Sequence, residues 1–196
     1  RYIANNQTML DGRTVTMQEY MREITQRGMR GEIPFDESLK SRFGMACEFL
    51  TLEEMKRIVE RIPLRKGAKE ALQQIERGYD ICVVSGGVYE LVDHCLAVNG
   101  IGVDYLAASG IKTVKGKLEV FPLMDKSTPI EQLKRKSRYD YVVAMGDGAN
   151  DAAMKKVSNR FIWINPKDGL QQKDDKVLGD DISMLPNMLR DFTKTI

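Results

Sequence analysis

The sequence feature that most constrains the fold is residues 145–151, Met-Gly-Asp-Gly-Ala-Asn-Asp. Residues 139–144 before them are apolar and aromatic and predict a buried strand, whereas residues 152–157 after them have a short helical pattern. A strand, a glycine-containing turn and carboxylates at a helix start are typical of the sheet edge where α/β folds bind ligands. The segment therefore favours an α/β fold with a site at this loop.

Beyond Pro63, helical and strand-like patterns alternate along the chain. Helices are expected at 66–77, 88–98, 127–137, 151–157 and from 184, and strands at 79–84, near 104–108, at 140–145 and at 160–164. Such alternation is typical of a mostly parallel sheet covered by helices. Residues 110–123 interrupt it as a predicted hairpin, because Lys115-Gly116-Lys117 supplies a turn between β-prone flanks.

The first third of the chain has a different pattern. A short strand at residues 2–4 precedes a polar turn, and no convincing strand follows between residues 14 and 60. Helices are expected at 16–27, 38–50 and 52–61. Thr51 is predicted to cap the last of them, with Glu54 at the capping-box position.

Length and charge limit the class of protein. A chain of 196 residues can bury one sizeable core, with room for a small inserted module. The net charge is +2 and the basic clusters are short, so nucleic-acid binding has little support. No apolar stretch approaches the length of a membrane span. We therefore expect neither a nucleic-acid partner nor a membrane partner.

The three cysteines, Cys47, Cys82 and Cys95, have no metal-ligand spacing. Each lies in an apolar-periodic segment, so we expect small buried hydrophobes in a reducing compartment. The first residues also lack the pattern of a signal peptide. These features predict a cytoplasmic protein. The single histidine, His94, has no motif around it and is expected to be structural.

Two carboxylates of the 145–151 loop are candidate metal ligands. Asp147 and Asp151 flank the amide of Asn150, and hard oxygen ligands grouped in this way suit Mg²⁺. The alternative is an ordinary turn in which Asn150 or Asp151 is only a helix N-cap. That alternative explains one glycine and one polar residue, but not two glycines and two aspartates together. A binding site is the better interpretation.

A second loop predicts an anion site. Ser85-Gly86-Gly87 follows an apolar strand pattern and precedes a helix, so backbone N–H groups there are free to receive an oxyanion. The signal is weak alone, because serine also caps helices and glycine also turns chains. Lys126, at the start of the helix before the aspartate-rich strand, could supply a positive charge. Its alternative is a solvated surface lysine.

Together these segments resemble the haloacid dehalogenase (HAD) superfamily of phosphohydrolases, and most closely its phosphoserine phosphatase-like branch. Residues 29–42 are also similar to the cap segment of that branch, with Phe35, Ser38, Leu39 and Arg42 at matching spacing. The resemblance implies an α/β fold with a HAD-like, Rossmann-like parallel sheet as its core and an inserted helical cap. The implied boundaries are 1–13 and 62–196 for the core and 14–61 for the cap.

The resemblance also implies roles for individual residues. Phosphate would be bound by Thr8, Ser85, Gly86, Gly87, Lys126 and Asn150, substrate by Arg13, Met29 and Arg42, and the cofactor Mg²⁺ by Asp147 and Asp151. The ligand would be a small phosphorylated or anionic molecule. In an intact member, an aspartate after the first strand attacks the phosphoryl group, and a second aspartate acts as general acid and base.

The first motif of the family, Asp-x-Asp-x-Thr, is degenerate in this chain. Thr8 fits its threonine, which puts Ala4 at the nucleophile and Asn6 at the general acid/base, and no Asp or Glu precedes Asp11. Hydrolysis and Mg²⁺ affinity are both expected to suffer. Arg13 stands where many relatives carry a glutamate for the substrate ammonium group, so Arg13 would favour an anion instead.

Three functions remain open. The first is a HAD-fold protein that has lost hydrolysis and keeps an anion pocket for binding or regulation. The second is a working Mg²⁺-dependent phosphomonoester phosphatase whose first motif is altered in this chain or reads in another register. The third is a partner-binding protein with a vestigial pocket, which the joint presence of Ser85, Lys126, Asp147 and Asp151 disfavours.

Overall fold

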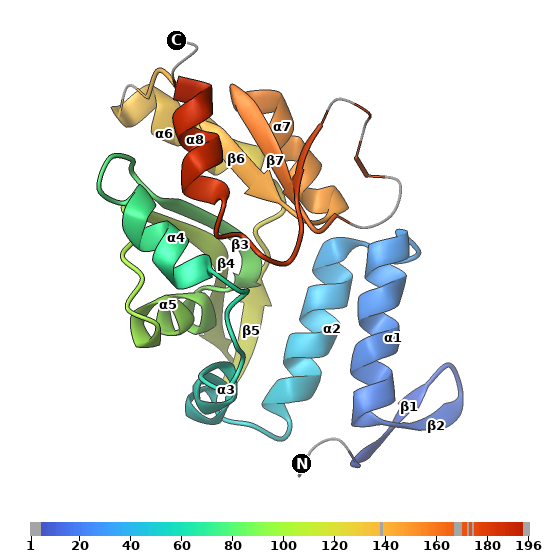
Figure 1. The fold of residues 1–196 in the computed structure, drawn as a ribbon. Helices are drawn as coiled ribbons and strands as arrows, with labels where there is room; N and C mark the ends of the chain where they lie inside the picture. The colour runs from blue at the N-terminus through green and yellow to red at the C-terminus, as the bar shows by residue number, and fades with distance from the viewer. Residues whose placement is uncertain (1–4, 138, 167–169, 172, 174, 194–196) are drawn as a thin grey trace.

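A computed structural model of the protein describes residues 5–137, 139–166, 170, 171, 173 and 175–193 (Figure 1). The helices are α1 (Met17–Arg30), α2 (Phe35–Cys47), α3 (Leu52–Val59), α4 (Ala68–Ile75), α5 (Tyr89–Val98), α6 (Ser127–Ser137), α7 (Ala152–Val157) and α8 (Leu185–Thr193), with a 3-10 turn at Ala149–Asp151. The strands are β1 (Gln7–Leu10), β2 (Arg13–Thr16), β3 (Cys82–Val88), β4 (Tyr105–Val114), β5 (Lys117–Phe121), β6 (Val143–Gly146), β7 (Arg160–Ile164) and β8 (Lys176–Leu178).

The strands form three small sheets. β3 and β4 pair in parallel and β5 adds to β4 antiparallel, whereas β6, β7 and β8 are all parallel. Helices cover these strands, and the predicted α/β class with parallel sheets is confirmed. The predicted hairpin at 110–123 is also present as β4 and β5, with Lys115 and Gly116 at φ of 48° and 77° in its turn.

Local signals explain where the first helices begin. The hydroxyl of Thr16 accepts the N–H of Glu19 and the Glu19 carboxylate accepts the N–H of Thr16, which satisfies two backbone donors at the start of α1. Thr51 and Glu54 form the same capping box at α3, as the sequence predicted. Gly31, in the left-handed region at φ 74°, ends α1.

Three expectations about elements were wrong. Residues 7–16 form the β1–β2 hairpin instead of a polar turn, because Asp11 and Gly12 adopt the positive φ angles of a two-residue turn. β3 runs through Val88, so Ser85-Gly86-Gly87 lies within a strand, at a register shift between Val84 and Val88. β8 was not expected at all.

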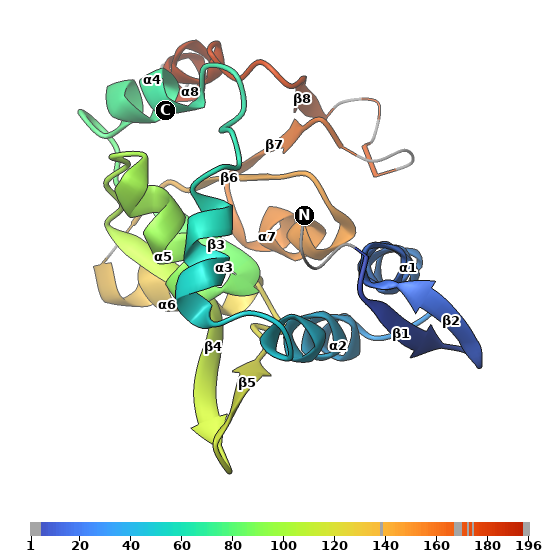
Figure 2. The same cartoon turned by 90° about the horizontal axis from the view of Figure 1, so that it is seen from below.

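Two apolar clusters pack around the sheets, and one of them includes side chains of α2 and α3. In the first, Leu39 and Phe43 of α2 pack with Met55 of α3 against Val88 and Val120, and α2 lies beside β5 (Figure 2). The second lies under β6 and β7 and contains Trp163, which is 2% exposed. The first cluster therefore fixes α2 and α3 against the β3–β5 sheet.

The sheets that contain β3 and β6 share no strand among the described residues. Within the described ranges, β3 pairs only with β4 and β6 only with β7. A cavity of about 430 Å³, lined mainly by apolar side chains that include Ile81 and Val143, lies at the starts of these two strands. The strand predicted at residues 2–4 lies outside the described residues.

The prediction of buried cysteines was wrong. Cys82 is exposed and Cys47 and Cys95 are half-buried, and all three are free thiols. Cys82 lines the cavity between β3 and β6, which explains its exposure, because no described strand covers it there. His94 accepts or donates a hydrogen bond at 2.8 Å with Glu60, a surface contact between α5 and the end of α3. No described helix has the length and apolar character of a membrane span.

Candidate functional site

The loop between β6 and α7 is held together by the carboxylate of Asp151. One of its oxygens, Oδ2, accepts the backbone N–H groups of Asp147 and Gly148, both at 2.9 Å. Gly146 makes this turn possible, because a Cβ at Gly146 would lie 2.2 Å from the Cβ of Asp151. The glycine and the second aspartate of the motif therefore form one unit, and neither is a simple helix cap.

The other oxygen of Asp151 binds Lys126. The Lys126 Nζ lies 2.5 Å from Oδ1, and the side chains are only 17% and 8% exposed. Burial by itself raises the pKa of Asp151, but the hydrogen bond from Lys126 and those from the Gly148 and Asp147 backbone outweigh it, and the pKa is lowered. Asp151 is therefore charged, and both of its carboxylate oxygens have partners. Lys126 lies close to the loop, as the sequence predicted.

A cavity of about 320 Å³ lies beside this pair. Its walls come from the end of α1, the start of α2 and the loop after β6. The lining residues are Thr25, Gly28, Met29, Phe35, Ser38, Arg42, Lys126, Asp147, Gly148, Ala149, Asn150, Asp151 and Leu170. Two cations and two carboxylates thus face one cavity of the size of a small molecule.

Close packing of α1 on α2 shapes the wall of this cavity. Gly28 lies against Ser38, whose Oγ would be 2.8 Å from a Cβ at that position. The same hydroxyl donates to the carbonyl of Ile24 at 3.0 Å and is buried. One turn further on, Arg42 donates its Nε to the Ser38 carbonyl at 3.1 Å. Burial lowers the pKa of Arg42, but an arginine stays charged.

The Ser85-Gly86-Gly87 segment touches the cavity only through Phe35. A Cβ at Gly86 would lie 2.6 Å from the Phe35 ring, so only glycine fits beneath this ring. The Ser85 hydroxyl accepts the N–H of Gly87 at 3.0 Å, which uses one of the N–H groups predicted to bind an anion. None of the three residues lines the cavity itself.

Asn6 and Thr8, the described residues assigned to the first motif, do not line the cavity. The Asn6 carbonyl accepts the N–H of Met17 at 2.7 Å, at the start of α1, and the cavity lies near the other end of this helix. Met17 and Thr25 are roughly 12 Å apart along the axis at 1.5 Å per residue. Thr8 and Arg13 lie on the hairpin beside the same helix start (Figure 2). Ala4 lies outside the described residues.

Asp147 is the more accessible of the two predicted metal ligands. Its side chain is 58% exposed, and Arg65 Nη2 lies 3.7 Å from its Oδ2. Asp151, in contrast, has both oxygens engaged. Among the residues that the structure describes, no group of three or more His, Cys, Asp or Glu side chains could hold a metal ion. The described residues therefore offer Mg²⁺ few free carboxylate oxygens, and the assignment of Asp147 and Asp151 as its ligands stays a prediction.

Several residues that shape the site were not predicted from the sequence. Ser109, fully buried, donates to the Gly86 carbonyl at 2.9 Å and accepts the N–H of Leu123 at 3.0 Å, so it ties β3 to the segment before Lys126. Arg65 was missed as well. Neither residue belongs to a local motif, and no sequence signal marked them. Gly28, directly after the helix predicted at 16–27, lies inside the observed α1 where that helix packs closely on α2.

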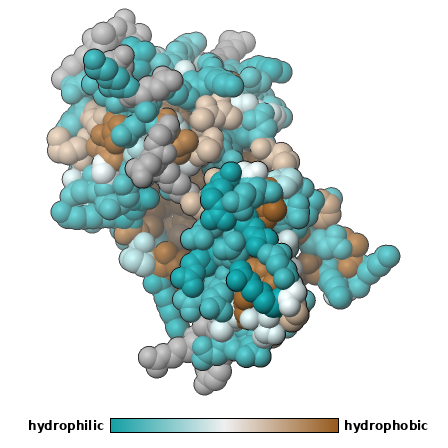
Figure 3. Space-filling view, turned by 90° about the vertical axis from the view of Figure 1, so that its right-hand side faces the viewer, coloured by the Kyte–Doolittle hydropathy of each residue, from teal (hydrophilic) through white to brown (hydrophobic). Residues whose placement is uncertain are grey.

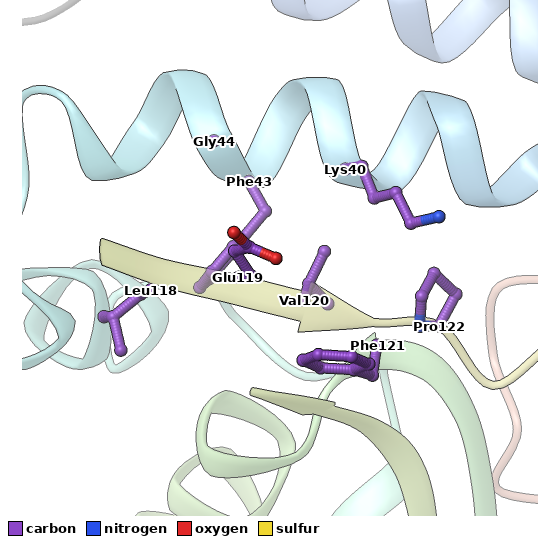
Figure 4. A pocket seen from close by; sticks show the side chains of 8 residues that line it. All are labelled: Lys40, Phe43, Gly44, Leu118, Glu119, Val120, Phe121 and Pro122. Carbon is purple, nitrogen blue, oxygen red and sulfur yellow. The ribbon is translucent and has the colours of Figure 1, made fainter. Parts of the chain in front are cut away.

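A larger cavity of about 460 Å³ lies between α2 and β5, and none of the predicted site residues lines it (Figure 4). Its lining comes from Lys40, Phe43 and Gly44 of α2 and from residues 118–122. Phe43 points from the helix toward β5, and Lys40 pairs with Asp36 at 3.0 Å. The face on the right of Figure 1 is mainly hydrophilic, with apolar side chains in separate patches (Figure 3). The candidate site is therefore the smaller cavity.

The fold and the loop geometry place the chain in a known class. The family model for haloacid dehalogenase-like hydrolases matches residues 2–158. The chain therefore belongs to the haloacid dehalogenase-like hydrolase family.

Its relatives place it in the phosphoserine phosphatase-like branch. The chain is 34% identical over 162 residues to the phosphoserine phosphatase of Archaeoglobus fulgidus, which covers 78% of this chain and 46% of that protein. It is 31% identical over 187 residues to the phosphoserine phosphatase of Methanocaldococcus jannaschii, with 88% and 85% covered. A solved substrate-bound phosphoserine phosphatase complex superimposes with a TM-score of 0.72 at 29% identity, over 91% of this chain and 85% of that one.

Proposed function

We propose that the protein binds a small phosphorylated or anionic ligand in the cavity between α1, α2 and the loop after β6, and that it hydrolyses phosphate esters slowly or not at all. Lys126 and Arg42 supply positive charge to the cavity, and Asn150 supplies an amide. Met29 adds an apolar contact at the rim. The core–cap division at residues 13/14 and 61/62 is part of this proposal.

The observation that carries the binding function is the Lys126–Asp151 pair. A structural ion pair buried to this extent costs desolvation energy and is often no better than apolar packing. Here the pair also locks two N–H groups of a loop that lines a cavity. A charge held rigidly at a cavity wall is suited to receiving an anion, because little ordering remains to be done on binding.

The observation against hydrolysis is the missing nucleophile. Ala4 has no oxygen with which to attack phosphorus, and Asn6 cannot take up and return a proton. Asp11, the first carboxylate of the chain, is the nearest substitute in another register. Asp11 pairs with Arg27 in the hairpin turn region, and it does not line the cavity. Asp11 therefore does not supply this cavity with a nucleophile for a working phosphatase.

We do not expect the proposed site to bind Mg²⁺ tightly. In relatives of intact sequence it would neutralise charge between attacking group and phosphoryl oxygens. In this chain Asp147 is one exposed carboxylate with an arginine beside it, and both oxygens of Asp151 are in use. We propose a cytoplasmic location on the basis of three free cysteines, which a reducing compartment would preserve.

Calorimetric titration with inorganic phosphate tests the binding function. The double variant Lys126→Met, Asp151→Asn removes both charges without leaving either one buried alone, so folding is not confounded. It is expected to weaken phosphate binding roughly tenfold or more, since a charge-assisted hydrogen bond contributes about 1.5–3 kcal/mol. Lys155→Met, Asp175→Asn is the matched control, because that pair at 2.5 Å lies outside the cavity lining. Equal affinity in both double variants would remove Lys126 from the site.

A further inference from the structure

We propose that this pocket binds its anion without a divalent metal, because the guanidinium of Arg65 supplies at Asp147 the positive charge that a metal would supply. The inference rests on the proposed anion pocket and adds to it a built-in cation. Arg65 lies between α3 and α4, in a segment far from residue 147 along the chain. Its contact with Asp147 is therefore a product of the fold.

Arg65 is held in place by a second carboxylate. Its Nη1 lies 2.5 Å from Oδ1 of Asp180, and its Nη2 lies 3.7 Å from Oδ2 of Asp147. Asp180 is in turn fixed by the side-chain amide of Asn165, which donates to it at 2.8 Å. The planar fork of arginine can bridge two carboxylates in this way, whereas a lysine ammonium is a point charge. Arg65 is thus positioned beside Asp147 by groups outside the cavity.

Charge balance at the cavity explains why a cation is needed there. Asp151 is neutralised by Lys126 at 2.5 Å, but Asp147 also lines the cavity and is negative. An unpaired carboxylate would repel an incoming phosphate. Arg65 offsets this charge, so the loop faces the cavity without an uncompensated aspartate. A divalent cation bound at Asp147 would lie close to the Arg65 guanidinium. Repulsion between these two positive charges disfavours binding of the cation there.

A purely structural role for Arg65 is the competing explanation. Arg65 and Lys66 together tie the segment before α4 to residues 180 and 181, since Lys66 Nζ lies 2.7 Å from Asp181. If that were the whole role, loss of either cation would affect stability alone. Variants of these two residues therefore form a matched pair. Each variant removes one positive charge from the same segment, but of the two side chains only that of Arg65 lies near Asp147.

The experiment measures inorganic phosphate binding by calorimetry to the wild-type protein, Arg65→Gln, Arg65→Lys and Lys66→Gln, each with chelator and with excess Mg²⁺. Wild type and Lys66→Gln are expected to bind phosphate equally under both conditions. Arg65→Gln is expected to bind roughly tenfold more weakly with chelator and to recover affinity when Mg²⁺ is added. Arg65→Lys keeps the charge and should stay independent of the metal, which separates loss of charge from loss of shape.

Two results would overturn the inference while leaving the anion pocket in place. One is wild-type binding of phosphate only in the presence of Mg²⁺. The other is an Arg65→Gln protein that folds, as judged by circular dichroism, and binds phosphate as wild type does with chelator. Absence of phosphate binding by the wild type under both conditions would instead contradict the proposed function itself.

Discussion

At the scale of single residues, Asp151 connects the sequence motif to the cavity. Its two oxygens take three donors from different parts of the chain, which are Lys126, Asp147 and Gly148. Such convergence explains why a glycine at 146 and an aspartate at 151 occur together, because a Cβ at Gly146 would clash with Asp151. The two carboxylates differ, since Asp151 is buried and paired and Asp147 is exposed.

Acid should weaken the fold through Asp151 in a defined direction. Although burial opposes it, hydrogen bonding from Lys126 and from the loop backbone holds the folded pKa of Asp151 below its ordinary value. The folded state thus binds fewer protons than the unfolded state at this group. The stabilisation is present above about pH 4 and is lost as the pH falls through the folded pKa. Urea unfolding between about pH 6 and pH 3 should show a smaller loss of unfolding free energy for Asp151→Asn than for wild type.

Exposed carboxylates such as Asp181, whose pKa is lowered chiefly by Lys66, contribute a background to that measurement. Asp181→Asn serves as the comparison, since it removes the exposed ion pair with Lys66 and keeps an amide oxygen that can accept the N–H of Ser183. A pH dependence of Asp151→Asn equal to that of wild type would show that Asp151 does not titrate below its ordinary range.

Sequence reasoning placed Asp147, Asn150, Asp151 and Lys126 near one another, and all four line one cavity. Their roles in binding phosphate and metal stay predictions. Arg65 was not predicted, because its contacts join residues far apart in the chain and no spacing rule reports them. Thr8 was placed at the site through a motif register, yet the structure has it in a hairpin at the start of α1.

At the scale of elements, helix periodicity and capping predicted most helices within a few residues. α6 and β7 have the predicted bounds, and Thr51 caps α3 as expected. The short β1–β2 hairpin and β8 were missed, because strands of three or four residues leave little periodicity to detect. The approach of α1 to α2 depends on side-chain size at single positions, which periodicity does not report.

Two glycines inside helices offer a matched test of that approach. Gly28→Ala would bring a Cβ within 2.8 Å of the Ser38 hydroxyl and should push α1 from α2, at a cost of ~1–3 kcal/mol. Gly44→Ala meets no atom within 4 Å and should stabilise α2 by about 0.5–1 kcal/mol. Denaturant unfolding reports both values. Similar gains in stability from both substitutions would show that the helices are not in close contact at Gly28.

At the scale of the whole molecule, membership of a hydrolase family suggests turnover, whereas the proposed assignment of the first motif argues against it. The chain has the fold of haloacid dehalogenase-like hydrolases and resembles phosphoserine phosphatases over most of its length. No Asp or Glu precedes Asp11 in its sequence, so the proposed register of the first motif leaves it without the carboxylate that begins the reaction in such a hydrolase. The described part of the structure keeps a cavity with fixed positive charge. Retained binding with lost turnover accounts for both sets of observations.

Phosphorus-31 NMR of phosphoserine mixed with the protein and Mg²⁺ tests this account most directly, because one spectrum reports binding and turnover. The ester resonance is expected to shift or broaden on addition of protein, while no inorganic phosphate accumulates. Loss of a group that acts as a unit with its neighbours costs ~10⁴–10⁶ in rate, so turnover should stay below detection. Growth of an inorganic phosphate signal that Asp147→Asn abolishes, or an ester resonance that the protein leaves unchanged, would contradict the account.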